Sequence, residues 1–129
     1  MVLVDTSVWV DFARRGERGR AVAMRDLLEA GEVATCGPVA AELLAGAEGE
    51  VAERMWGTLS SLPWAELDAR GWHEVGIAAG RLRRGGETLP LTDLAIAVAA
   101  SRADQAVWSF DADFGRIRDA LEDFELYEP

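Results

Sequence analysis

The stretch Val2-Leu3-Val4-Asp5 opens the chain with three apolar residues and ends abruptly at an acid. A short apolar run of this kind is typical of a buried strand, with the acid at its carboxyl end. The stretch Val107-Trp108-Ser109-Phe110-Asp111 repeats the arrangement near the end of the chain. If both strands belong to one parallel sheet, both acids lie at the edge where such sheets bind ligands.

Segments with strand and helix patterns alternate along the rest of the chain. Strands are expected at 2–4, 32–36, 64–67, 106–108 and 124–127, and helices at 6–14, 24–28, 39–46, 48–59, 72–84, 91–100 and 114–121. The stretch 91–100 is apolar except for Thr92 and Asp93, which indicates a helix buried on most sides. The alternation predicts one α/β domain over residues 1–129, with three α/β/α layers around a mostly parallel sheet of four to five strands.

Length and composition fit one cytoplasmic domain. The chain has 129 residues, 50% of them hydrophobic, and a net charge of −10. No apolar run reaches the roughly 18 residues that a membrane span needs, and the N-terminus lacks a signal-peptide pattern. Cys36 is the single cysteine, which excludes an internal disulfide and a cysteine-based zinc site. A reducing cytoplasm is therefore the expected compartment.

The types of basic residue narrow the chemistry. All 13 basic residues are arginines, and His73 is the single histidine. The absence of lysine excludes a P-loop and Schiff-base chemistry, and one histidine excludes a polyhistidine zinc site. Any reaction must therefore depend on carboxylates, arginines and hydroxyls.

Several carboxylates are candidates for that chemistry, although each also has an ordinary structural explanation. Asp5 fits an N-cap, and Asp93 fits the first turn of a helix capped by Thr92. Glu42 stands among small and apolar residues of a predicted helix, or else at its solvated edge. Asp113 fits a cap of the last helix as well as it fits a ligand.

Acids that converge in one crevice repel one another unless a cation lies between them. Ligand sets made of oxygen alone suit Mg²⁺ or Mn²⁺. Such an ion lowers the pKa of a bound water and offsets the charge that develops on a phosphate. This chemistry requires neither lysine nor histidine.

Four segments of the chain are similar, in order and spacing, to four motifs of one family. They are Val4-Asp5-Thr6-Ser7-Val8-Trp9-Val10, Ala41-Glu42-Leu43-Leu44-Ala45-Gly46, Leu89-Pro90-Leu91-Thr92-Asp93-Leu94-Ala95-Ile96-Ala97 and Ser109-Phe110-Asp111-Ala112-Asp113-Phe114. Over nearly its whole length the sequence resembles the PIN-domain family, and within it the VapC-type toxin ribonucleases of bacterial toxin–antitoxin pairs. Ser109 stands where the family often has threonine, which keeps the hydroxyl.

The resemblance implies Mg²⁺-dependent cleavage of RNA by Asp5, Glu42, Asp93 and Asp111, with Asp113 as an auxiliary metal ligand. Whether Asp111 or Asp113 is the principal fourth ligand stays open. The resemblance also implies a homodimer and a cognate VapB-like antitoxin that neutralises the enzyme.

The remaining candidates concern RNA and antitoxin binding. A charge of −10 opposes RNA binding, but arginines cluster at 14–20 and at 81–84. Solvated surface explains both clusters, and placement beside the acids would instead let them hold the RNA backbone. The predicted substrate contacts are Thr6, Ser109, Arg14, Arg15, Arg81 and Arg84. Val8, Trp9 and Phe12 are core candidates, and any exposed part of them would form a groove for an antitoxin helix.

The alternative function is a non-catalytic PIN-like module that binds RNA or a protein partner. Loss of one core acid would mark such a module, and none is lost. A phospho-acceptor receiver domain would need a lysine. A phosphatase of the haloacid dehalogenase type would need Asp-x-Asp where this chain has Asp5-Thr6-Ser7.

Overall fold

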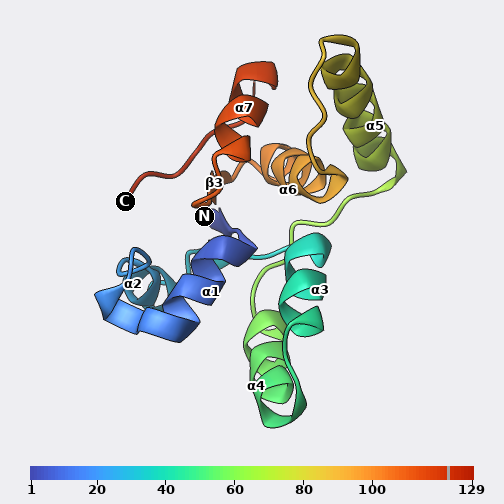
Figure 1. Cartoon of the computed structure of the whole chain (residues 1–129). Coiled ribbons are helices and arrows are strands. Elements are labelled where there is room, and N and C mark those ends of the chain that lie inside the picture. Colours follow the sequence, from blue (N-terminus) through green and yellow to red (C-terminus); the bar gives the residue numbers. More distant parts are fainter. Residues whose placement is uncertain (122) are drawn as a thin grey trace.

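The computed structural model describes residues 1–121 and 123–129, and a small parallel sheet lies at its centre (Figure 1). β1 (Val2–Val4) is the middle strand, flanked by β2 (Val33–Ala34) and β3 (Ala106–Trp108). Both neighbours run parallel to it, with Val2 opposite Val33 and Val4 opposite Trp108. The carboxyl ends of β1 and β3 therefore meet at one edge, as the sequence predicts.

The prediction of four to five strands is wrong, because the described residues form a three-stranded sheet. The segment 64–67 pairs with the sheet only through a bridge between Thr35 and Trp64, and 124–127 only through a bridge between Val107 and Leu126. Each segment exchanges one pair of backbone hydrogen bonds around a single strand residue. One such pair holds the segment at the edge of the sheet but does not extend into a ladder.

Helices cover both faces of the sheet. They are α1 (Thr6–Arg15), α2 (Met24–Glu29), α3 (Gly37–Ala45), α4 (Gly49–Ser60), α5 (Ala69–Arg84), α6 (Leu91–Arg102) and α7 (Asp113–Ala120), with a 3-10 turn η1 (Gly16–Arg18) after α1. Successive strand residues point to opposite faces. Val2 and Val4 pack with α1 and α2, whereas Leu3 packs with α3 to α7. The arrangement confirms the predicted α/β/α layers.

α6 is the most buried helix, as its apolar sequence predicts. Every residue from Leu94 to Ala100 is buried, because α6 packs against α5, α7, α3 and β3. Asp93 lies in its first turn and is only half-buried. Of the helices in the described part of the chain, none combines the length and the apolar character that a membrane crossing requires.

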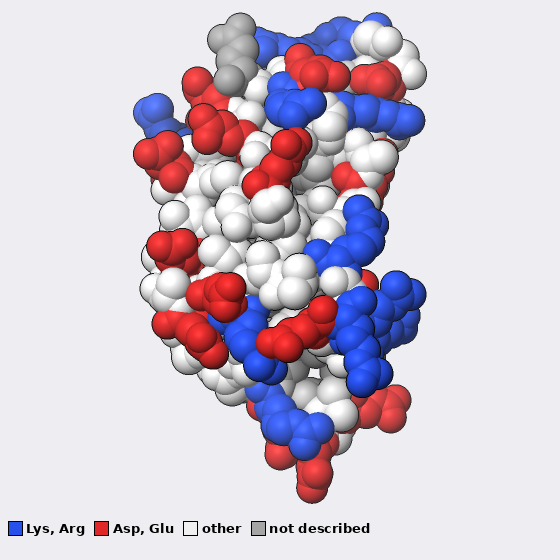
Figure 2. Space-filling model, turned by 90° about the vertical axis from the view of Figure 1, so that its left-hand side faces the viewer, with Lys and Arg blue, Asp and Glu red and all other residues white. Residues whose placement is uncertain are grey.

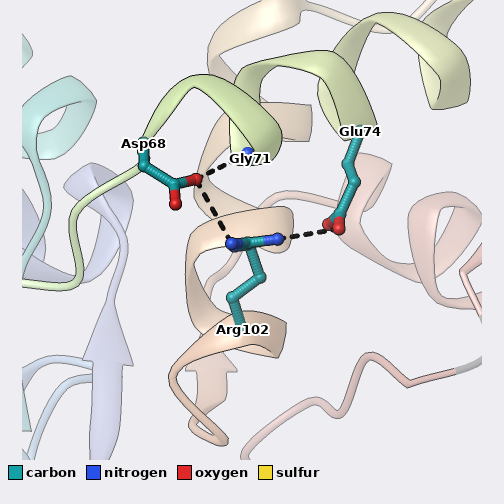
Figure 3. A network of polar contacts seen from close by, with 4 residues as sticks. All are labelled: Asp68, Gly71, Glu74 and Arg102. Atoms are coloured by element: carbon teal, nitrogen blue, oxygen red, sulfur yellow. Dashed lines mark hydrogen bonds and ion pairs between the residues drawn. The ribbon is translucent and has the colours of Figure 1, made fainter.

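A group of ionic contacts joins the end of α6 to the start of α5 (Figure 3). Arg102 donates from Nη1 to Glu74 at 2.8 Å and from Nη2 to Asp68 at 3.2 Å. Asp68 also accepts a hydrogen bond from the backbone N–H of Gly71 at 2.9 Å, which caps α5. All three charged side chains are at least 33% exposed. Solvent screening therefore limits what these contacts add to stability.

We expect apolar packing to outweigh these ion pairs in holding α5 and α6 together. Ile96→Ala should lower the free energy of unfolding by about 2–4 kcal/mol, because Ile96 is fully buried. Arg102→Gln should lower it by about 1 kcal/mol or less. Urea denaturation of both variants checks the order. A larger loss in Arg102→Gln than in Ile96→Ala would contradict it.

Candidate active site

Asp5 follows β1 directly and is 6% exposed. Its backbone N–H donates to the carbonyl of Trp108 at 2.9 Å, which joins the carboxyl ends of β1 and β3. Its side chain makes no capping hydrogen bond to α1. Instead, Asp5 Oδ2 accepts hydrogen bonds from the hydroxyls of Ser7 at 3.0 Å and Ser109 at 2.6 Å. The carboxylate thus binds two hydroxyl groups at the sheet edge and does not cap the backbone of α1.

The two hydroxyls also hold the loop that follows β3. Ser7 Oγ accepts the backbone N–H of Phe110 at 3.0 Å, and Ser109 Oγ accepts that of Asp111 at 3.0 Å. Asp111 Oδ1 in turn accepts the backbone N–H of Asp113 at 2.9 Å. We call Asp5, Ser7 and Ser109 the serine–aspartate network. It positions the acidic loop relative to β1.

Ser7 is a site residue that the sequence pattern does not predict. The pattern favours Thr6 instead, whose hydroxyl oxygen is buried and makes no hydrogen bond to any described residue. Ser109 was selected as a substrate contact, and in the structure its hydroxyl bonds to Asp5 and Asp111. One feature of the sequence could have identified Ser7, because a serine lies two residues from each strand-end acid, Ser7 from Asp5 and Ser109 from Asp111. A linear pattern does not show which of two adjacent hydroxyls points toward the acid.

Asp93, Asp111 and Asp113 lie closest together among the candidate acids. One carboxylate oxygen from each lies within 4.8 Å of the others. Asp111 is exposed in the loop after β3, whereas Asp113 begins α7 and is 3.7 Å from the Arg116 guanidinium. Burial, and after it the charges of Asp5, Asp111, Asp113 and Glu42, raise the pKa of Asp93 to about 7. Asp93 thus lies within electrostatic reach of the other four predicted acids.

Glu42 approaches this group from α3. It is an exposed residue, yet partial burial of its carboxyl and the charge of Asp5 raise its pKa. The thiol of Cys36, at the start of α3, is buried, and its pKa is raised to about 11 by burial and then by Asp5 and Glu42. A thiol of this kind stays protonated at neutral pH, so it is a poor nucleophile.

The donor set fits a hard divalent cation. Within residues 1–121 and 123–129, Asp93, Asp111 and Asp113 are the only group of three potential metal ligands close enough to share an ion. The ligands are all carboxylate oxygens, which Mg²⁺ and Mn²⁺ prefer. A cation between them would offset the repulsion that raises the pKa of Asp93.

The predicted arginine contacts lie in two separate places. Arg14 and Arg15 are exposed at the end of α1, and Arg81 and Arg84 are exposed at the end of α5. Figure 1 shows the end of α5 at the top of the molecule and the end of α1 in its lower half. On the face seen in Figure 2, basic side chains gather at the lower right and along the top edge, while acidic ones are scattered. The arginines do not form one continuous surface on this face.

The apolar residues of α1 serve mainly as core. Val8 is fully buried, and its contact with an antitoxin stays a prediction. Trp9 and Phe12 are half-buried and pack against the core beside the sheet. Of the three predicted antitoxin contacts, Trp9 and Phe12 have exposed surface.

Comparison with known proteins identifies the family. A model described as PIN domain matches residues 2–120. The chain is 38% identical over 122 residues to VapC ribonuclease Mb1587 of Mycobacterium bovis and to ribonuclease VapC11 of Mycobacterium tuberculosis, which covers 88% of this chain and 89% of each relative.

Solved structures with low sequence identity share the fold. VapBC-1 from nontypeable Haemophilus influenzae superposes with a TM-score of 0.76 at 17% identity, covering 99% of this chain and 98% of that one. FitAB bound to a DNA fragment superposes with a TM-score of 0.75 at 22% identity, covering 98% and 94%. Similarity at these identities concerns the fold alone.

The raised pKa of Asp93 predicts a pH dependence of stability in the metal-free protein. Between its ordinary value of 3.8 and about 7, folded Asp93 keeps a proton that the unfolded chain releases. The free energy of unfolding should therefore fall as pH rises through this range. Asp93→Asn should reduce that fall by on the order of 1 kcal/mol, after allowance for partial exposure.

Urea denaturation with EDTA at pH 4.5 and pH 7.5 measures this difference. Asp119→Asn, an exposed change at the other end of α7, is the control. Equal pH dependence in wild type and Asp93→Asn would contradict the prediction.

Proposed function

The chain belongs to the PIN-domain family, and on that premise we propose that it is a divalent-metal-dependent endoribonuclease that cleaves RNA with water. The observation that carries the proposal is the convergence of four other carboxylates on Asp93 at the carboxyl edge of the sheet. Its relatives at 38% identity are named as VapC ribonucleases, which supports RNA as the substrate. Loss of an acid would favour a non-catalytic module, and all five acids are present.

Asp5, Glu42, Asp93, Asp111 and Asp113 would hold the cation. Mg²⁺ or Mn²⁺ suits this oxygen donor set. When bound, such an ion lowers the pKa of a water and offsets the negative charge that develops on the phosphate. The proposed catalytic residues are Asp5, Glu42, Asp93 and Asp111.

The protein's own groups orient the carboxylates and control their protonation. The hydroxyls of Ser7 and Ser109 fix Asp5 Oδ2, and the Ser109 hydroxyl also fixes the backbone of Asp111. Asp93 has to release its proton before its oxygens can serve as ligands, so cation affinity should rise toward neutral pH. His73 lines a cavity of about 580 Å³ on α5 whose described lining includes none of the five acids.

We further propose that the enzyme is a cytoplasmic toxin neutralised by a VapB-like antitoxin, and that it forms a homodimer. The names of its relatives and the presence of VapBC complexes among its structural neighbours support this role. The half-buried Trp9 and Phe12 on α1 are the proposed contacts for a helix of the antitoxin. The net charge of −10 favours a basic partner.

Removal of single carboxylates tests the nuclease assignment. Wild-type protein should cut single-stranded RNA with added Mn²⁺, and Asp5→Asn or Asp93→Asn should lower kcat by about 100-fold or more, since each removes a charged ligand. Asp111→Asn should cost more than Asp113→Asn, because Asp111 comes directly from the end of β3. Gel assays of RNA cleavage measure all four variants, with Asp119→Asn as the matched control.

Wild-type activity retained in Asp5→Asn or Asp93→Asn would show that these carboxylates are not ligands. A larger loss of activity in Asp113→Asn than in Asp111→Asn would make Asp113 the principal fourth ligand. Absence of cleavage by the wild type with Mn²⁺ would reject the nuclease assignment itself.

The serine–aspartate network predicts an effect of a residue that is not itself a ligand. Ser109→Ala removes the shortest hydrogen bond to Asp5 and leaves the Asp111 N–H without its acceptor. Cation affinity should fall about 10- to 100-fold, as for other groups that orient metal ligands. Ser109→Thr keeps the hydroxyl and should restore it. Calorimetric titration with Mn²⁺ measures these affinities, and unchanged affinity in Ser109→Ala would remove the network from the account.

A further inference from the structure

Arg20 lies against the acidic loop from outside the sheet. Its guanidinium carbon is 4.0 Å from the centre of the Phe110 ring. Phe110 stands between Ser109 and Asp111, and its backbone N–H is bound by Ser7. Its ring also packs edge-on against the buried Trp108 at a centroid distance of 6.0 Å. Arg20 is therefore tied to a ring that the serine–aspartate network holds in place.

The backbone on both sides of Arg20 is held against α1. The N–H of the fully buried Ala21 donates to Asp11 Oδ2 at 2.9 Å. Gly19 packs so closely that a Cβ there would collide with the Asp11 carboxylate and lie 2.8 Å from Arg15 Cβ. This segment presents Arg20 from a fixed position rather than from a loose loop.

The stacked guanidinium keeps its hydrogen-bonding edges available. A planar guanidinium carries its N–H donors in the plane of the group, so stacking on an aromatic face leaves them free. Arg20 is exposed, and its side chain forms no ion pair or hydrogen bond with any residue that the structure describes. Arg25, by contrast, pairs with Glu17 at 2.9 Å. Arg20 is thus preorganised for an anion.

We propose that Arg20, stacked on Phe110, binds a phosphate of the RNA beside the acidic cluster. The inference rests on the proposed nuclease function and adds a phosphate contact to the same site. A chain with a charge of −10 and five converging acids repels RNA. The positive charge of Arg20, which lies on the Phe110 ring next to Asp111, offsets that repulsion where the substrate has to approach. It also sets the register of the RNA backbone on the site.

The test compares Arg20→Gln with Arg25→Gln, which makes the same charge change on the neighbouring helix α2. The probe is a labelled single-stranded RNA incubated with Mn²⁺. Arg20→Gln should raise KM about tenfold while kcat stays within about twofold, since the contact forms in both ground and transition states. The slope of log kcat/KM against log salt concentration should become shallower by about 0.7, the value for one phosphate contact on a single strand. Arg20→Lys keeps the charge but lacks the planar guanidinium, so its KM and salt slope should lie between those of the wild type and of Arg20→Gln.

The outcomes separate this inference from the nuclease assignment. If the wild type cuts RNA and Arg20→Gln has the KM and salt slope of Arg25→Gln, the phosphate contact is wrong. If Arg20→Gln lowers Tm and kcat but leaves KM unchanged, Arg20 only braces Phe110, and the proposal is overturned. If the wild type cuts no RNA with Mn²⁺, the nuclease assignment fails and the phosphate contact fails with it.

Discussion

The hydrogen bonds that two serine hydroxyls donate to the Asp5 carboxylate connect the fold to the site. Ser7 belongs to α1 and Ser109 to the loop after β3, so the contacts join segments a hundred residues apart in the chain. The parallel pairing of β1 with β3 brings the two strand ends together. The hydroxyls then determine how the acidic loop leaves the sheet. Without them, Asp5 would be a buried carboxylate with no donor, and Asp111 would have no fixed direction.

The acids that converge on this edge oppose folding. Burial and the neighbouring carboxylates together make Asp93 harder to ionise and raise its pKa to about 7. The apolar core on both faces of the sheet supplies the stability that tolerates this repulsion. The same arrangement of carboxylates that weakens the fold favours the binding of a cation. The negative charge also repels RNA, and the proposed phosphate contact of Arg20 offsets this repulsion.

Much of this organisation could be predicted from the sequence, because periodic patterns control it. The apolar runs that end at Asp5 and Asp111 predicted the strand ends, and the apolar stretch 91–100 predicted the buried helix with Asp93 at its mouth. The number of strands could not be predicted, because 64–67 and 124–127 have strand composition but only one bridge each. Ser7 and the stacking of Arg20 on Phe110 were also missed. Both depend on side-chain directions between distant segments, which no local pattern encodes.

We propose that Asp5, Glu42, Asp93, Asp111 and Asp113 hold the divalent cation on which RNA cleavage depends. Anomalous diffraction from crystals of the wild-type protein grown with Mn²⁺ tests this arrangement. A Mn²⁺ peak is expected among these carboxylates, with Ser7 and Ser109 still bonded to Asp5. A Mn²⁺ peak elsewhere on the protein, with none among these acids, would contradict it.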